Sequence, residues 1–250
     1  MRVIPKLLKS LGTEKEAKHV VKFYPDQRLE PLFTPLHPEP ATIEVINEGT
    51  LNTATQLAGF VSSEEQQQHN PRPAVLNFAD SDRPGGGWRN GAMAQEETIC
   101  YRSSLDWSLT ANPRNYLLRG GILYSPYVLV AMGADYEKLP GPTNALLVVN
   151  VLSVAAIRKP RVARWKMQSS NPAEVREKCV FARDKERNIT KLKMRLCLRV
   201  AANRAHRVLV LGALGCGVYQ NPSDDIAHCW LEVLREDEFS GNRAKFASRC

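Results

Sequence analysis

Short apolar segments alternate with segments of helical spacing along most of this chain. The apolar segments are rich in β-branched residues, and we predict strands at 41–46, 73–79, 121–133, 145–156 and 207–215. The segments of helical spacing predict helices at 50–61, at about 93–107, at about 187–203 and at 223–234. Strands that alternate with helices are typical of an α/β fold in which the sheet lies between two helical layers.

The first 40 residues differ in composition from the rest. They are charged and then rich in proline, with Pro31, Pro35, Pro38 and Pro40. We interpret residues 1–40 as a lead-in arm and residues 41–250 as one domain, because the remainder contains neither an internal repeat nor a linker long enough to divide it.

Membrane and secretion signals are missing from the sequence. No run of about 18 apolar residues is present, and the N-terminus lacks the apolar core and cleavage site of a secretory signal. We therefore expect an intracellular protein, in the nucleus, the cytoplasm or both, with no membrane partner.

The six cysteines form no CxxC pair, and the five histidines lie far apart. This pattern argues against a zinc site and, in a reducing compartment, against disulfides. We expect no metal and no cofactor.

The net charge of +8 is concentrated in one block. Residues 158–207 contain sixteen Lys and Arg residues against four acidic residues, a local excess of +12. Such a block suits a polyanionic partner. The alternative is a solvated helix face, because Ile189, Leu192, Leu196 and Val200 form an apolar stripe with basic residues between them.

Three consecutive glycines, Gly85, Gly86 and Gly87, follow the strand predicted at 73–79. Glycine loses much chain entropy on folding, so such a run needs a reason. Either a ligand lies against bare backbone or the chain makes a tight turn. The run matches neither the GxGxxG nor the GxxxxGK[ST] pattern, which argues against nicotinamide dehydrogenases and P-loop hydrolases.

Gln95, Glu96 and Glu97 occupy the first turn of the next predicted helix. Acidic residues are favoured there by the helix dipole alone. Consecutive helical residues project about 100° apart, so the two carboxylates are not expected to flank one bond as in a conventional glycosidase. One acid at the reaction centre, with its neighbour holding the substrate, fits this geometry better.

A second glycine-rich segment, GALGCGVYQN at 212–221, follows the last predicted strand. Loops at the carboxyl ends of strands bind ligands in α/β sheets, although a plain strand-to-helix turn is an equal alternative. Tyr219 is placed to stack on a sugar or base, or simply to pack.

The segment NFADSDRPGGGWRNGAMAQEETICYRSSL, residues 77–105, resembles the signature of microbial-type poly(ADP-ribose) glycohydrolases, and the similarity extends over about 43–235. The resemblance implies a macrodomain-like, three-layer α/β/α fold with a mixed central sheet. It also implies an enzyme that hydrolyses ribose–ribose bonds of poly(ADP-ribose), mainly from the chain ends, to release ADP-ribose.

The resemblance further implies roles for individual residues. Gly85, Gly86 and Gly87 would wrap the terminal ADP-ribose, and Glu97 would be the general acid and base. Glu96 would hydrogen-bond ribose hydroxyls and Gln95 would orient the two acids.

The remaining roles implied by the resemblance concern binding. Gly215, Cys216, Gly217 and Val218 would hold the diphosphate, with Tyr219 as the aromatic at the end of that loop. Asn77 would help to shape the site.

Two departures from the family pattern are visible. Many relatives carry asparagine near Asp80, where it can contact the distal ribose, and the C-terminal segment fits the usual closing strand of the family poorly.

Two alternative functions remain open: a macrodomain that binds ADP-ribose without hydrolysis, and a hydrolase of mono-ADP-ribosylated proteins. The expected partners are poly(ADP-ribose), ADP-ribose and poly(ADP-ribosyl)ated proteins, and direct DNA binding is not predicted.

Overall fold

The computed structural model describes residues 3–24, 29, 41–58, 72–111, 116, 120–168 and 175–239. The chain divides into two compact units, residues 1–155 with 196–212 and residues 156–195 with 213–250. In the described part of the chain, no helix is long and apolar enough to cross a membrane.

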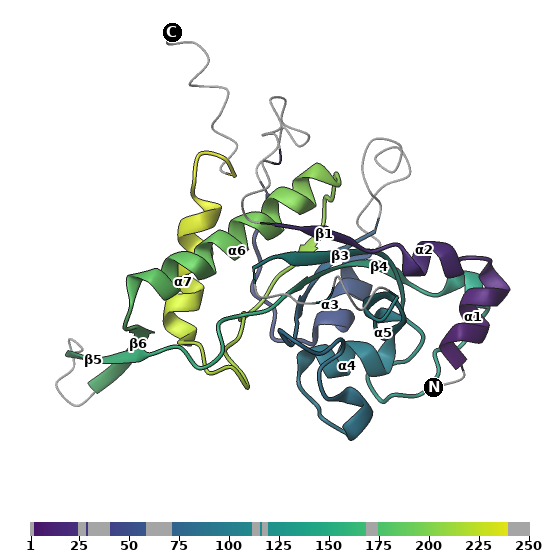
Figure 1. Ribbon diagram of the computed structural model, residues 1–250, viewed down its shortest axis with the longest axis horizontal. Helices are drawn as coiled ribbons and strands as arrows, with labels where there is room; N and C mark the ends of the chain where they lie inside the picture. The colour runs from purple at the N-terminus through teal and green to yellow at the C-terminus, as the bar shows by residue number, and fades with distance from the viewer. Residues whose placement is uncertain are drawn as a thin grey trace, which may run out of the picture. The chain divides into compact units, whose positions relative to one another are not determined.

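The first unit is built on a five-stranded mixed sheet in the order β1-β3-β4-β2-β7 (Figure 1). Its strands are β1 (Val21–Phe23), β2 (Ala74–Phe78), β3 (Ile122–Leu129), β4 (Val148–Val154) and β7 (Leu209–Val210). Strand β2 is parallel to both β4 and β7, whereas β3 is antiparallel to both β1 and β4. This confirms the predicted α/β class and the mixed central sheet.

Helices pack on one face of this sheet. They are α3 (Thr50–Leu57), α4 (Gln95–Arg102) and α5 (Leu105–Leu109), and a short 3-10 helix, η3 (Trp88–Asn90), precedes α4. Apolar side chains of α3, α4 and α5, including Leu51, Ile99 and Leu105, form one buried cluster with Val75 and Val151 of the strands. The N-terminus of α4 is thereby held beside the carboxyl end of β2.

The other face of the sheet is covered by the chain that follows α6 (Asp184–Asn203), a helix that begins in the second unit and ends in the first. His206 Nε2 lies 2.9 Å from the Tyr124 hydroxyl, and the guanidinium of Arg204 stacks on the rings of Phe23 and Tyr124. Burial lowers the pKa of His206 to about 4, so its imidazole is neutral near pH 7.

Residues 3–24 differ from the lead-in arm that we expected. They form α1 (Val3–Leu11), α2 (Glu14–Lys18) and β1, which adds a strand to the sheet. Leu7, Leu8 and Ala17 are buried against Leu129 and Ala131, because the apolar side of these short helices has sheet residues to cover. This part of the predicted arm is therefore integrated into the first unit.

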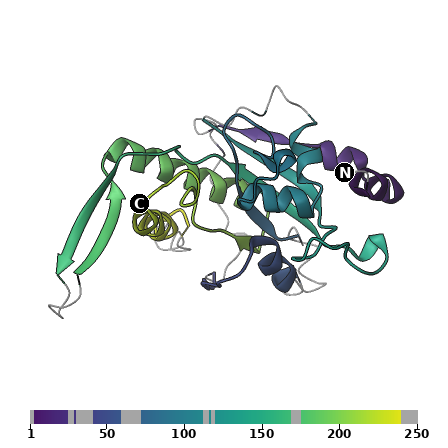
Figure 2. The same ribbon diagram turned by 90° about the horizontal axis from the view of Figure 1, so that it is seen from below.

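The second unit combines a hairpin and two helical segments (Figure 2). Strands β5 (Val162–Gln168) and β6 (Val175–Phe181) are antiparallel, and α7 (Ser223–Leu234) packs against β6. The hairpin was not predicted from the sequence, whereas the bounds predicted for α7 are confirmed.

Three predictions of local structure are wrong. Residues 41–46 are not a strand: the described residues provide no neighbouring strand for them, and Val45 is 101% exposed. The strand predicted at 207–215 is also much shorter than expected. Strand β7 is two residues long, and it lies at the edge of the sheet, where it pairs with β2 alone.

The third wrong prediction is the single helix at about 93–107. It is interrupted at Ser103, which leaves the helix in an extended conformation and bridges Val130 of the sheet. The predicted cap also differs, because Gly49 is the N-cap of α3 and Thr50 is its first residue. Two further predictions lie outside the described residues: the end of the helix predicted at 50–61, and the C-terminal segment beyond residue 239.

Candidate active site

The loop after β2 begins with a turn organised by Asp80. Its Oδ1 atom accepts hydrogen bonds from the backbone N–H groups of Asp82 and Arg83, at 2.8 and 2.9 Å. The Gly86 N–H then donates to the Arg83 carbonyl at 3.0 Å. The Asp80 carboxylate is thus used to shape the loop, which is a local role that asparagine could also perform.

The tight turn that we considered for the glycine run is present in this loop. Gly85 and Gly86 adopt positive φ angles of 73° and 59°, as a tight turn requires. In addition, a Cβ atom on Gly86 would lie 2.3 Å from Oε1 of Glu97 and 3.1 Å from Oε2 of Glu96. The run therefore makes a turn and also admits two carboxylates against bare backbone.

Gln95 fixes the start of α4 to the end of β2. Its Oε1 accepts from the Phe78 N–H at 2.8 Å, and its Nε2 donates to the Leu76 carbonyl at 2.6 Å and to Oγ1 of Thr50 at 3.1 Å. Since both ends of the amide are engaged by the protein, Gln95 positions the helix that carries the two acids.

Glu96 is the more enclosed of the two acids, with only 2% of its surface exposed. Oε2 accepts from the Asp80 N–H at 2.7 Å, while Oε1 lies 3.3 Å from both Nδ2 of Asn77 and the Tyr116 hydroxyl. Burial, and to a smaller extent the nearby Glu97, raise the pKa of Glu96 to about 8, although these hydrogen bonds oppose the shift. Glu96 is thus mostly protonated near pH 7.

Glu97 has a different environment from its neighbour. Its Oε1 accepts a 2.9 Å hydrogen bond from the Gly87 N–H, and its side chain makes no other hydrogen bond to a described residue. Both acids reach the same side of the loop at Gly86, although consecutive helical residues project in different directions. The arrangement offers one carboxyl group enclosed by protein and one directed at the glycine loop.

Sequence reasoning missed two residues of this site, Tyr116 and Ser153. The Tyr116 hydroxyl donates to the Asp80 carbonyl at 2.8 Å, and Oγ of Ser153 accepts from Asn77 at 3.0 Å. Neither residue lies in a motif, because each reaches the acids only through the folding of distant segments.

The second predicted loop, 212–221, is described within the second unit from Ala213 onward. Gly215 has a φ of 75°, and a Cβ atom there would lie 2.4 Å from that of Ala156. The buried Nδ2 of Asn221 donates to the carbonyls of Ile157 and Gly215 at 2.7 and 3.1 Å. Asn221, which we had not singled out, therefore holds this loop in shape.

Other members of this loop are more open. Nothing described lies within 4 Å of a Cβ atom on Gly217, and Val218 is exposed. Cys216 is half-buried, which raises the pKa of its thiol to about 11 and keeps it neutral. The Tyr219 carbonyl accepts a 2.8 Å hydrogen bond from the Lys159 N–H.

Comparisons with known proteins agree with this geometry. The family model for the microbial-type poly(ADP-ribose) glycohydrolase catalytic domain matches residues 9–131, which include the glycine loop and both acids. Over this segment, just under half of its length, the chain is similar to microbial-type poly(ADP-ribose) glycohydrolases. A comparison with curated proteins found no match.

Solved structures of this family are similar to the chain over most of its length. The poly(ADP-ribose) glycohydrolase from Thermomonospora curvata is 26% identical, with a TM-score of 0.70, over 91% of this chain and 78% of that one. The enzyme from Deinococcus radiodurans, solved in complex with ADP-ribose, is 27% identical, with a TM-score of 0.66, over 91% of this chain and 85% of that one.

Most of the predicted site residues converge in the first unit. Asn77, Asp80, Gly85, Gly86, Gly87, Gln95, Glu96 and Glu97 lie together around the carboxyl end of β2 and the start of α4. Gly215, Cys216, Gly217, Val218 and Tyr219 form the loop of the second unit. The family signature thus corresponds to one hydrogen-bonded cluster.

Proposed function

We propose that this chain hydrolyses the ribose–ribose O-glycosidic bonds of poly(ADP-ribose), mainly from the chain ends, and releases ADP-ribose. The observation that carries the proposal is the contact between Glu97 and the glycine loop, where the Gly87 N–H donates to the carboxylate and Gly86 leaves room for it. The match to the microbial-type family model and the similarity to a relative solved with ADP-ribose support this choice of ligand.

Glu97 is the acid that we assign to the reacting bond. Cleavage leaves oxocarbenium character on one ribose and negative charge on the departing oxygen. Glu97 donates a proton to that oxygen and, once ionised, activates the water that attacks the cation. Its single hydrogen bond to Gly87 orients the carboxyl group and leaves the other oxygen available for this proton transfer.

Glu96 has a holding role in this proposal. Its enclosed, largely protonated carboxyl group can donate a hydrogen bond to a ribose hydroxyl. Fewer negative charges near the loop also favour the approach of a diphosphate, which is itself anionic. Asn77 and Tyr116 keep this carboxyl group in place.

Poly(ADP-ribosyl)ated proteins are the macromolecular partners that follow from this activity. The proposal of cleavage from chain ends comes from the resemblance to family members that lack large accessory domains.

The decisive experiment incubates the purified chain with labelled poly(ADP-ribose). We expect free ADP-ribose as the main product, and a Glu97→Gln variant should lose about 10²- to 10⁴-fold in rate while it still binds ADP-ribose. The exposed Glu16→Gln serves as the control, because it makes the same chemical change on α2, far along the chain from the signature.

Other results would support the alternatives. Retention of polymer without release of ADP-ribose would indicate a binding module. Inertness toward polymer together with release from a mono-ADP-ribosylated protein would indicate the other hydrolase. Unchanged hydrolysis in Glu97→Gln would remove Glu97 from the reaction.

A further inference from the structure

The part of the basic block that lies in the second unit, residues 158–195, contains two segments with different surroundings. On α6, Arg187 pairs with Asp225 at 2.8 Å and with Glu232 at 2.6 Å, and Lys191 pairs with Glu232 at 2.9 Å. Arg195 likewise pairs with Glu236 at 2.6 Å. The acids on and after α7 thus neutralise much of the positive charge on this part of α6. These cations therefore do not need a polyanionic partner to explain their presence.

The segment RKPRVARWK, residues 158–166, is different. It contains five basic residues and no acidic residue, and all five side chains are exposed: Arg158, Lys159, Arg161, Arg164 and Lys166. Among the described residues, its one ion pair joins Arg164 to Glu177 at 4.0 Å, between side chains that are 73% and 49% exposed. A pair this long and exposed contributes little, so the segment keeps its positive charge.

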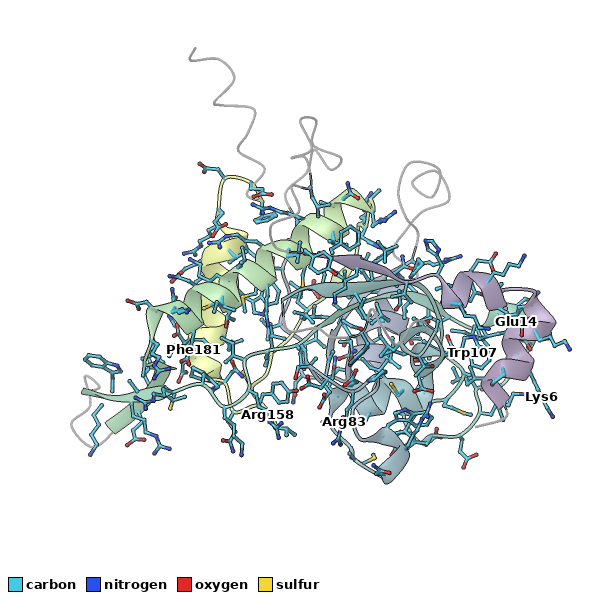
Figure 3. All side chains as sticks on the ribbon, in the orientation of Figure 1. Lys6, Glu14, Arg83, Trp107, Arg158 and Phe181 are labelled. Atoms are coloured by element: carbon cyan, nitrogen blue, oxygen red, sulfur yellow. The ribbon has the colours of Figure 1, made fainter. Side chains whose placement is uncertain are left out.

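An exposed aromatic ring lies within this charged segment. Trp165 is 64% exposed on β5, between Arg164 and Lys166, and its cross-strand neighbour is Lys178. Tryptophan normally buries most of its ring, so a solvated indole among cations needs an explanation. Strands β5 and β6 extend beyond the helices of their unit (Figure 2), and Arg158 at the base of the hairpin carries its charge outward (Figure 3).

We propose that the β5–β6 hairpin is a second binding surface for poly(ADP-ribose), which contacts units of the polymer other than the one held by the glycine loop. The inference rests on the proposed function, since that function supplies the polymer. Each ADP-ribose unit offers two phosphates and one adenine. Exposed Arg and Lys side chains neutralise phosphates, and a tryptophan face stacks on a base. The segment 158–166, which leads into β5 and forms its first part, presents both kinds of group within nine residues.

The test compares the binding of long poly(ADP-ribose) with the binding of single ADP-ribose by fluorescence anisotropy. A Glu97→Gln background limits hydrolysis of the polymer. We expect Arg161→Ala/Arg164→Ala/Lys166→Ala to weaken polymer binding by at least about 10-fold and to reduce its salt dependence. Trp165→Ala should weaken it by about 5- to 100-fold. The affinity for single ADP-ribose should stay within about 2-fold in both variants, because a single unit does not bind to the hairpin in this proposal.

A matched control removes the same charge elsewhere. Lys6→Ala/Lys9→Ala/Lys15→Ala deletes three exposed positive charges from α1 and α2 and should leave polymer binding within about 3-fold of the parent. If polymer binding weakens equally in this control, the loss of affinity follows from net charge rather than from the hairpin, and the proposal is overturned. Loss of single ADP-ribose binding in parallel with polymer binding would overturn it as well.

Two further outcomes separate this inference from neighbouring ones. If single-stranded DNA or RNA of equal phosphate number displaces the polymer at equal or lower concentration, the hairpin is a nucleic-acid surface and the assignment to poly(ADP-ribose) is wrong. The unsubstituted chain, with Glu97 intact, is tested for release of ADP-ribose as well. If it binds polymer through the hairpin but releases no ADP-ribose, the proposed function is wrong and the hairpin surface is still supported. Thermal melting of each variant checks that the fold is intact.

Discussion

Oε1 of Glu96 lies 3.3 Å from the hydroxyl of Tyr116, and both side chains are buried. The same hydroxyl lies closer, at 2.8 Å, to the Asp80 carbonyl, which can only accept a hydrogen bond. A tyrosine has one hydroxyl hydrogen, so this hydrogen is directed mainly to Asp80. The longer contact with Glu96 is then the weaker of the two, and it opposes the rise in the pKa of Glu96 without cancelling the effect of burial.

Tyr116→Phe should lower the free energy of unfolding by about 1–3 kcal/mol, because the buried Asp80 carbonyl and Glu96 lose a partner. Urea unfolding measures the change. The control is Tyr127→Phe, at a buried ring whose hydroxyl has no hydrogen-bond partner in the described part of the chain. An equal loss in both variants would show that the Tyr116 hydrogen bonds contribute nothing specific.

Gly86→Ala should abolish most of the activity. The added Cβ would lie 2.3 Å from Oε1 of Glu97 and would push the carboxylate away from the Gly87 N–H, so we expect polymer hydrolysis to fall by about 100-fold or more. Initial rates of ADP-ribose release measure the loss.

Gly91→Ala is the matched control for backbone strain. Gly91 also has a positive φ, of 83°, but nothing described lies within 4 Å of its Cβ position. We expect it to cost about 1–2 kcal/mol of stability and to leave the rate within about 3-fold of the parent. If the two variants lose activity equally, strain in the loop rather than contact with Glu97 explains the effect.

The stability of the protein should depend on pH through Glu96. Its pKa is raised from 4.5 in the unfolded chain to about 8 in the fold. Between these values the folded state keeps a proton that the unfolded state releases, so the free energy of unfolding falls as pH rises. The contribution is fully present below pH 4.5 and is lost as pH rises through 8.

Glu96→Gln tests this dependence, because glutamine keeps the shape of the side chain and does not titrate. We expect the parent to lose stability relative to the variant from pH 5 to pH 8, at no more than about 1.4 kcal/mol per pH unit. Urea unfolding at several pH values provides the measurement, and other groups cancel in the difference. Parallel curves for the two proteins would mean that Glu96 titrates normally.

The loop of the second unit allows stability and binding to be tested separately. Gly215→Ala would place a Cβ 2.4 Å from that of Ala156 and 2.5 Å from Nδ2 of Asn221, at a positive φ, so we expect a loss of about 2–4 kcal/mol in stability. Gly217→Ala meets no described atom and should leave stability within about 0.5 kcal/mol.

If Gly217 approaches the diphosphate, as the family resemblance implies, Gly217→Ala should weaken ADP-ribose binding by about 10-fold or more, measured by calorimetry. Unchanged affinity in Gly217→Ala would exclude close contact between this backbone and the ligand.

The sequence by itself determined the elements whose signals are local. Interior strands rich in β-branched residues are recognisable without knowledge of their partners. Three strands were predicted in this way: β2 from segment 73–79, β3 from 121–133 and β4 from 145–156. The bounds of α7 were also evident. The signals for these strands and this helix come from residues close to one another in the sequence.

Tertiary structure alone decided the features that depend on distant partners. Residues 41–46 have the composition of a strand but no described strand beside them, and the predicted helix at 93–107 is broken because Ser103 pairs with Val130. Glu96 and Glu97 are neighbours of the same type in the sequence but have different partners in the fold, since Asn77, Asp80 and Tyr116 hydrogen-bond Glu96 alone. Likewise, α7 neutralises cations of α6 and leaves those of residues 158–166 exposed. Burial and pairing set the free energy of a charge, and both come from residues that a local pattern cannot identify.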